Sequence, residues 1–236
     1  MKRELLDRLL ADRAAQRTVV VATHLASGDQ RLIHPGDDDP LAAEAALAVR
    51  SDKPRTVETA DGDVFLNVFN PPLRMIIVGA VHIAQALAPM AAMTGYDVTI
   101  VDPRQAWATP ERFPDIRILD AWPDEALAEL KPDHRTAIVT LTHDPKLDDP
   151  ALQAALSSDA FYIGSLGSRG THAKRIQRLE TAGYDESRHS RIHGPVGLNI
   201  GAKSPAEIAV SIMAELTERL RRPGSRPGAV RAEAAA

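Results

Sequence analysis

The 236-residue chain contains no cysteine. This absence excludes disulfide bonds, thiolate metal sites and a cysteine nucleophile within the chain, and it fits a cytoplasmic location. No stretch approaches the roughly 18 consecutive apolar residues that a membrane-spanning helix needs. The charged start MKRELLDRLLADRAAQR lacks the apolar core of a secretory signal. A net charge of −4 gives no sign of nucleic-acid binding. We therefore expect a soluble cytoplasmic protein that binds neither membrane nor nucleic acid.

Common catalytic signatures are also missing. The sequence has no Walker A motif, no HExxH, no G-x-S-x-G and no EF-hand loop. It shows no Tyr-x-x-x-Lys or comparable hydride-transfer pattern. These absences favour a binding protein over an enzyme.

One stretch predicts the fold. Residues 75–78 are an apolar run that ends at Gly79, and from His82 apolar residues recur at helical spacing. Gly95 stops this helix, and a second apolar strand ends on Asp102, close to the spacing of about 20 residues expected for a ribose-binding acid. Strand, glycine turn, helix, strand and acid together predict the first βαβ unit of a Rossmann fold.

The glycine fingerprint of this unit is incomplete. The pattern G-x-G-x-x-G/A reads GAVHIA from Gly79 to Ala84, so Val81 stands where a second glycine would let a pyrophosphate approach the backbone. A β-branched side chain there crowds a dinucleotide, which disfavours NAD(P). The alternative is a Rossmann scaffold that no longer binds NAD in the usual pose, since fold alone does not give function.

Strands and helices continue to alternate after this unit. The pattern places strands at 137–141 and 161–163 and helices at 150–156 and 172–182, and Ser204 with Glu207 forms a capping box that starts the last helix. Such alternation predicts an α/β, Rossmann-like, mostly parallel sheet with helices on both faces.

Three segments are expected. Residues 1–70 form a small α+β N-terminal module, which contains a hairpin signal at Asp61-Gly62. The Rossmann-like domain covers 71–222, after a boundary marked by Asn70-Pro71-Pro72. Residues 223–236 are rich in Pro, Gly and Ala and are expected to be a disordered tail.

Ligands of open parallel sheets bind beyond the carboxyl ends of the strands. Four glycine-rich or charged stretches are predicted to lie there. We assign their residues to ligand binding and assign none of them to catalysis or to a metal site. The candidate ligand-binding residues are Gly79, Ala80, His82, Ile83, Asp102, Arg104, His143, Asp144, Gly164, Ser165, Gly167, Ser168, Arg169, Pro195, Gly197 and Gly201.

Several of these residues have two interpretations. Arg104 either pairs with a phosphate, as in NADP sites, or forms a salt bridge within its loop. His143, with Asp144 and Asp148, either holds a metal or moves protons, whereas the carboxylates alone are equally suited to capping a turn and a helix. We favour capping for Asp148 and ligand binding for His143. The loop from Gly164 to Arg169 is the strongest anion-site candidate, because small residues and helix-start amides can cradle a phosphate.

These motifs occur together in one known family. The segments VGAVHIAQAL, YDVTIVDPR, RFP, THD, YIGSLGSR, PVGLNIG and SPAEIAVSIMAEL resemble the Rossmann domain of the XdhC/CoxI family over roughly residues 70–220. The resemblance implies an accessory chaperone of molybdenum hydroxylases such as xanthine dehydrogenase or carbon monoxide dehydrogenase. Such a chaperone binds the molybdenum cofactor (molybdopterin or its dinucleotide form), protects it during sulfuration and inserts it into the apoenzyme. The predicted strand-end positions of His82, His143 and Arg169 suggest these side chains as contacts to the pterin or its molybdenum oxo groups.

Two departures from the family pattern stand out. The usual G-A-G-H is G-A-V-H here, and the cysteine-containing N-terminal module of longer relatives is reduced to a cysteine-free segment. The resemblance therefore implies three partners: the apoenzyme, a cysteine desulfurase that supplies sulfur, and a separate N-terminal-type family member. The apolar faces of the first and last helices leave room for a homodimer. The alternatives are an NAD(P)-dependent oxidoreductase and a scaffold that bridges sulfurase and apoenzyme without holding cofactor.

Overall fold

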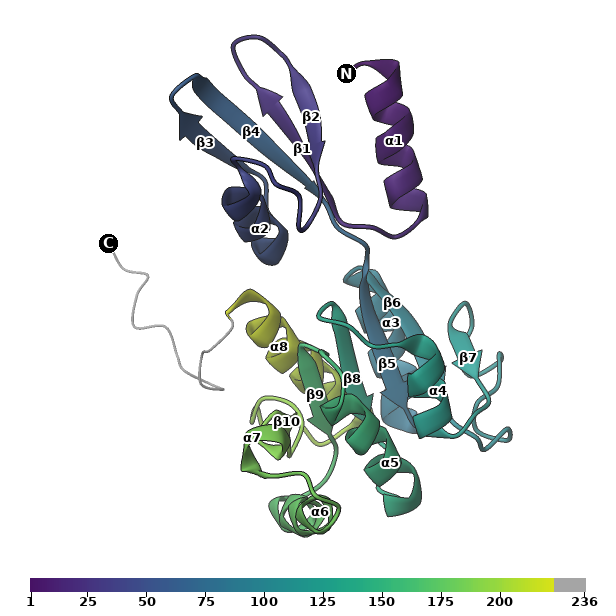
Figure 1. The fold of residues 1–236 in the computed structure, drawn as a ribbon. Coiled ribbons are helices and arrows are strands. Elements are labelled where there is room, and N and C mark those ends of the chain that lie inside the picture. Colours follow the sequence, from purple (N-terminus) through teal and green to yellow (C-terminus); the bar gives the residue numbers. More distant parts are fainter. Residues whose placement is uncertain (223–236) are drawn as a thin grey trace. The chain divides into compact units, whose positions relative to one another are not determined.

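The computed structural model describes residues 1–222, so the tail predicted at 223–236 lies outside the described residues. The chain divides into two compact units, Met1–Pro71 and a second unit that begins at Pro72 (Figure 1). Within residues 1–222, no helix combines the length and apolar character needed to cross a membrane.

The first unit is a four-stranded antiparallel sheet with a helix on each face. Its sheet order is β2-β1-β4-β3. Leu41 and Ala45, at the start of α2, pack on one face, and Leu9 of α1 packs with Val19 and Val21 on the other. The elements are α1 (Arg3–Ala14), β1 (Val19–His24), β2 (Gln30–Ile33), α2 (Ala42–Ser51), β3 (Arg55–Thr59) and β4 (Gly62–Phe69).

The second unit is a six-stranded parallel sheet in the order β10-β9-β8-β5-β6-β7. This arrangement confirms the prediction of a Rossmann-like α/β fold after a small α+β segment. The elements are β5 (Leu73–Val78), α3 (His82–Met93), β6 (Tyr96–Val101), β7 (Arg117–Leu119), α4 (Pro123–Leu130), β8 (Thr136–Thr140), α5 (Pro145–Leu156), β9 (Tyr162–Ser165), α6 (Arg169–Thr181), α7 (Glu186–His189), β10 (Ile192–His193) and α8 (Pro205–Arg221).

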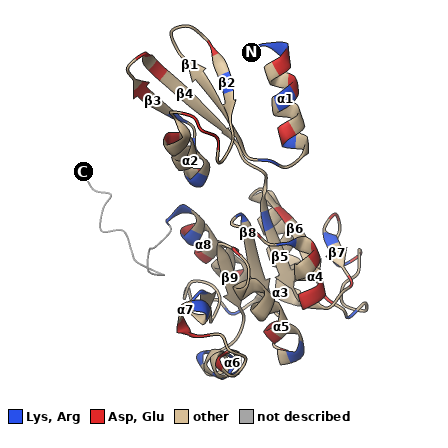
Figure 2. Ribbon diagram, in the orientation of Figure 1, with Lys and Arg blue, Asp and Glu red and all other residues tan. Residues whose placement is uncertain are grey.

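Helices cover both faces of this parallel sheet. On β5, Met75 and Ile77 face a core shared with α3 and α8, whereas Ile76 and Val78 face a core shared with α4, α5 and α6. Alternate strand residues point to opposite faces, so a strand covered on both sides reads as a continuous apolar run. The inner strands β8 and β9 carry no charged residue and are drawn wholly in tan in Figure 2.

Helix α5 begins earlier than the sequence suggested. It starts at Pro145 rather than near Pro150, with Asp144 as N-cap accepting a hydrogen bond from the Lys146 amide at 2.9 Å. A proline suits the first helical position because the amide it lacks has no partner there. Pro150, which the sequence pattern indicates as a start, lies inside the helix instead.

The region around β9 also differs from the prediction. The strand continues through Ser165, so Gly164 and Ser165 are buried strand residues and not part of a loop. Helix α6 begins at Arg169, three residues before the predicted start at His172, because Ser168 caps it. The short elements α7 and β10 were not predicted. The capping box of Ser204 and Glu207 at the start of α8 is confirmed.

Candidate functional site

The predicted ligand-binding segments all follow strands of the parallel sheet. Because the strands are parallel, the loops after β6, β5, β8, β9 and β10 emerge at one edge of the sheet. Strand β6 lies on one side of β5, and β8 and β9 lie on the other. Helix α3, which connects β5 to β6, covers one face of the sheet, and α5, which connects β8 to β9, covers the opposite face. The carboxyl ends of β5 and β8 therefore flank the topological switch point, where open α/β sheets bind their ligands.

The loops after β5 and β8 touch at this switch point. Gly79 has a φ of +111°, and a Cβ built there would lie 2.7 Å from Cγ2 of Thr142. Just before the loops diverge, the Leu141 amide donates to the Val78 carbonyl at 2.9 Å. Only glycine supplies both the backbone conformation and the space that this close approach requires.

Asp102 is a fully buried carboxylate with all its acceptor positions in use. One oxygen accepts from the backbone amide (3.0 Å) and Nε (2.8 Å) of Arg104, and the other from the Ala80 amide (2.8 Å) and Nη2 of Arg104 (2.7 Å). A carboxylate offers about four lone-pair sites. Burial opposes ionisation, but the bonds from Arg104 and Ala80 hold the pKa of Asp102 below its usual value. Of the two interpretations of Arg104, the structure contains the salt bridge within the loop.

The N-terminus of α3 at the switch point has no side-chain cap. Val81 is its N-cap residue and accepts nothing through its side chain, and His82 is exposed. The first-turn amides of a helix have no partner within the helix, and they carry the positive end of its dipole. By contrast, α5 and α6, which follow β8 and β9, are capped by Asp144 and Ser168. The α3 terminus therefore remains open to an anion.

The loop between β8 and α5 brings its polar groups to different places. His143 is exposed and adopts a φ of +60°. Asp148 lies in the first turn of α5 and accepts from the hydroxyl (2.6 Å) and the amide (3.3 Å) of Thr142. It thus holds the turn of this loop, as part of our prediction had it, but the helix cap that we also expected of it is supplied by Asp144. Burial raises the pKa of Asp148. Within the described part of the chain, no three His, Asp or Glu residues are grouped to hold a metal ion.

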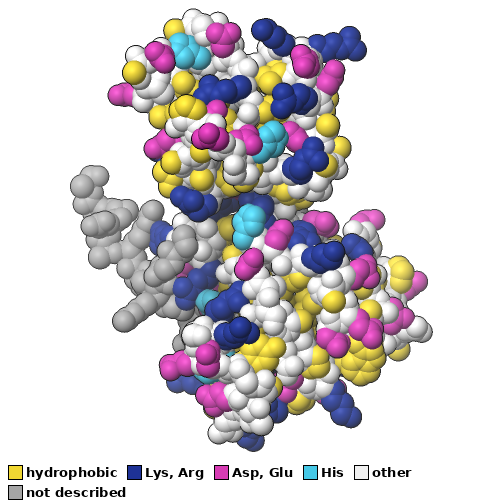
Figure 3. Space-filling model, in the orientation of Figure 1, with side chains coloured by type: hydrophobic (Ala, Val, Ile, Leu, Met, Phe, Trp, Pro, Cys, Tyr) yellow, Lys and Arg dark blue, Asp and Glu magenta, His cyan; other side chains and the backbone are white. Residues whose placement is uncertain are grey.

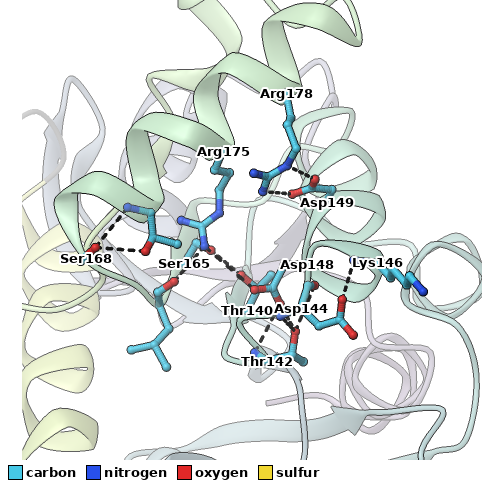
Figure 4. A network of polar contacts seen from close by, with 12 residues as sticks. Thr140, Thr142, Asp144, Lys146, Asp148, Asp149, Ser165, Ser168, Arg175 and Arg178 are labelled. Atoms are coloured by element: carbon cyan, nitrogen blue, oxygen red, sulfur yellow. Dashed lines mark hydrogen bonds and ion pairs between the residues drawn. The ribbon is translucent and has the colours of Figure 1, made fainter.

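The segment after β9 is tied to its neighbours by hydroxyl groups. Ser165 pairs with Thr140 at 2.5 Å in the interior, so its side chain is already engaged (Figure 4). Gly167 has a φ of +146° and lies in contact with Thr171. Ser168 accepts from the Thr171 amide at 3.1 Å, and Arg169 is exposed at the first position of α6. Of these predicted residues, Gly167, Ser168 and Arg169 are the ones that reach the surface.

The segment after β10 is held by a buried carboxylate. Glu215 of α8 accepts from the Tyr162 hydroxyl (2.5 Å) and the Gly197 amide (2.8 Å), and its other oxygen contacts Nδ1 of His193 at 3.1 Å. The Tyr162 and His193 rings stack with centroids 4.7 Å apart. Burial opposes ionisation of Glu215, but its bonds to His193, Tyr162 and Gly197 lower its pKa, whereas burial and Glu215 raise the pKa of Tyr162 well above its usual value.

A cavity of about 770 Å³ borders this cluster and is lined by Pro195 and Gly197 among others, whereas Gly201 lies beyond it and is exposed. The hydrogen bonds of Glu215 fasten the loop after β10 to α8. Because both oxygens of this carboxylate are engaged by Tyr162, Gly197 and His193, we assign Glu215 the role of holding this loop in place.

Sequence reasoning missed Glu215, Tyr162 and the buried Arg175. Glu215 stands between Met213 and Leu216 on the apolar face of the last helix, and a charged residue at such a position indicates a buried carboxylate with partners. Arg175 stands in a run of charged residues that reads as a solvated helix face, so no sequence signal pointed to its burial. In Figure 3, charges of both signs mix on the visible face of each unit, in keeping with the small net charge.

Comparison with known proteins gives a consistent result. Residues 75–216 match the family described as the XdhC Rossmann domain. The chain is 35% identical over 148 residues to the molybdenum cofactor insertion chaperone PaoD of Escherichia coli, covering 63% of this chain and 40% of that protein. It is also 35% identical over 161 residues to a Bacillus subtilis protein described as a probable xanthine dehydrogenase subunit, covering 68% and 47% respectively. The chain thus spans less than half the length of these two relatives.

A solved structure shares the fold. A Bacillus halodurans protein described as a xanthine dehydrogenase superposes with a TM-score of 0.68 at 24% identity, covering 95% of this chain and 67% of that one. At this level of identity the likeness concerns the fold alone.

Proposed function

The chain belongs to the XdhC Rossmann domain family, and on that premise we propose that it is an accessory chaperone that carries the molybdenum cofactor as cargo to a molybdenum hydroxylase apoenzyme. The relative named as a molybdenum cofactor insertion chaperone supports this proposal. The observation that carries it is the uncapped N-terminus of α3, which lies at the switch point beside the contact of Gly79 with Thr142.

The cargo suits this edge of the sheet. The pterin cofactor carries a phosphate or a dinucleotide extension, and open helix amides bind such groups without a charged side chain. Val81 leaves less room than a second glycine would, which favours a pose other than that of NAD(P). The exposed side chains of His82, His143 and Arg169 then provide polar contacts to the rest of the cargo.

The finer steps of the proposal rest on the family resemblance and on the composition of the chain. The chain has no cysteine and so forms no persulfide of its own, which means that a partner sulfurase acts directly on the cofactor held by the chain. The recipient is a hydroxylase of the xanthine dehydrogenase or carbon monoxide dehydrogenase type. A cytoplasmic location, a separate N-terminal-type partner and a homodimer remain predictions.

Equilibrium binding tests the proposal. The purified chain is titrated under anaerobic conditions with molybdenum cofactor and, separately, with NADPH. We expect cofactor binding without NADPH binding. NADPH binding alone would support an oxidoreductase, and binding of neither would support a scaffold; either result contradicts the proposal.

A charge variant tests the location. His82→Asp places an acid at the open terminus of α3, which repels an anion but suits the helix dipole. We expect about tenfold weaker cargo binding with no loss of stability. Ala206→Asp, at an exposed first-turn position of α8, is the matched control and should bind normally. Arg169→Ala should also weaken cargo retention.

A further inference from the structure

A second polar site lies between α5 and α6 and borders the loop after β8, since His143 is among its lining residues. It is a cavity of about 400 Å³, and its lining includes Asp148 of α5 and five residues of the α6 segment: Ser168, Thr171, Lys174, Arg175 and Arg178. The α6 residues recur at intervals of three and four, so they share one helix face. Figure 4 shows Arg175 and Arg178 extending from α6 toward α5.

Arg175 is the unusual member of this group. Its side chain is buried, with only 1% of the residue exposed, yet Nε and Nη1 have no hydrogen-bond partner. Nη2 donates to the Leu166 carbonyl at 2.8 Å and lies 4.0 Å from Oδ2 of Asp148. That oxygen of Asp148 is also without a hydrogen-bond partner. Buried polar groups are nearly always hydrogen-bonded, so two free donors on a buried guanidinium point to a missing acceptor.

The charges around the cavity favour a negative group as that acceptor. Arg178 is paired with Asp149 through two contacts of 2.5 and 2.9 Å, and Asp148 lies beside Arg175. Each of these two pairs is neutral, so the positive charge of Lys174 is in excess. The positive end of the α6 dipole adds to it, since the cavity also borders the first turn at Gly170.

We propose that this cavity is a phosphate subsite, in which the free N–H groups of Arg175 bind the oxygens of a phosphoryl group and Lys174 and Thr171 bind its outer face. An arginine fork matches the geometry of phosphate oxygens, and serine or threonine hydroxyls complete such sites. The cavity exceeds the size of one phosphate and so has room for part of a phosphate monoester. The proposed function assigns the cargo phosphate to the α3 terminus, so this subsite takes a different phosphoryl group and does not depend on that function.

Phosphate binding to the full chain tests this subsite without any cargo. Inorganic phosphate and phenyl phosphate are titrated at constant ionic strength, with the 31P resonance or the heat of binding as readout. We expect both to bind, and a tighter constant for phenyl phosphate would indicate a monoester over free phosphate. If neither ligand binds, the proposal is wrong.

Four variants locate the site. Lys174→Ala removes an exposed charge that lines the cavity and should weaken phosphate binding about tenfold. Asp148→Asn removes the facing negative charge, keeps an acceptor for Thr142 and should tighten binding several-fold. Arg175→Lys keeps the charge without the fork and should reduce binding at least as much as Lys174→Ala. Lys146→Ala, on α5 but outside the cavity lining, is the charge-matched control and should bind normally.

The pattern of results is decisive. Equal weakening by Lys174→Ala and Lys146→Ala would mean general electrostatic attraction and would overturn the proposal. Weaker binding in Asp148→Asn would also contradict it. Because both probes are free of molybdenum and pterin, a chain that binds phosphate here but not the cofactor would refute the proposed function and leave the subsite standing.

Discussion

Replacing Asp102 by asparagine should destabilise the second unit by about 3 kcal/mol at pH 7. Asparagine presents an acceptor in place of one carboxylate oxygen and an NH₂ donor in place of the other. The NH₂ group then faces two of the four N–H donors. These are the amide and Nε of Arg104 in one orientation of the asparagine, and the Ala80 amide and Nη2 of Arg104 in the other. A hydrogen bond to a charged group contributes about 1.5–3 kcal/mol. We use the lower half of that range because the Arg104 side chain is 36% exposed and can turn to water.

The pH dependence of this effect follows from the direction of the pKa shift. Burial favours the neutral acid, but the bonds from Arg104 and the Ala80 amide lower the pKa of Asp102 in the folded state. The stabilisation of the folded state by ionised Asp102 is therefore complete above the ordinary aspartate pKa. It is lost as the pH falls through the lower folded-state pKa. The free-energy difference between wild type and Asp102→Asn should be equal at pH 7 and pH 5 and should shrink only in strong acid.

Urea unfolding followed by tryptophan fluorescence measures this difference. The two tryptophans of the chain, Trp107 and Trp122, both belong to the second unit, so the signal reports that unit alone. Asp97→Asn, at an exposed position of β6, is the control and should change the unfolding free energy by less than about 0.5 kcal/mol. If Asp102→Asn is as stable as wild type, the four hydrogen bonds of Asp102 do not stabilise this unit and our reasoning is wrong.

Two further predictions concern the loops of the same edge. Gly79→Ala should lower the unfolding free energy by about 2–4 kcal/mol, because it combines a positive φ with a clash against Thr142. Gly95→Ala, with a φ of +91° and open space around it, should cost only about 1 kcal/mol in the same urea assay, and equal losses would show that the Thr142 contact is unimportant. Glu215→Gln should speed hydrogen exchange of the Gly197 amide at least tenfold, because the neutral amide side chain replaces a charged acceptor. Unchanged exchange measured by NMR would mean that Glu215 does not hold this loop.

Much of the fold could be predicted because its signals are local. The apolar run of β5, the glycine at position 79 and the helical spacing after His82 reflect strand and helix geometry directly. The capping box of Ser204 is read in the same way. The start of α5 was wrong because two prolines compete there, and Asp144 with Pro145 is a better start signal than Pro150.

The candidate site was less predictable, because burial and pairing depend on residues distant in sequence. Asp102 has the position of a ribose ligand, but its oxygens are occupied by Arg104 and a backbone amide of the neighbouring turn. Arg175 looks like one more surface cation until α5 is packed against α6. A one-dimensional pattern places residues at the edge of the sheet, but it does not show which of their hydrogen-bonding groups remain free.

The two outer strands of the parallel sheet have a consequence for how this protein meets other chains. β7 has three residues and β10 has two, whereas the central β5 has six. An edge strand recruits another polypeptide by offering a row of unpaired backbone groups, and strands this short offer very few. We therefore expect the second unit to resist edge-to-edge aggregation. Recognition of a partner protein through this unit must then rely on the side chains of its helices and loops rather than on strand addition.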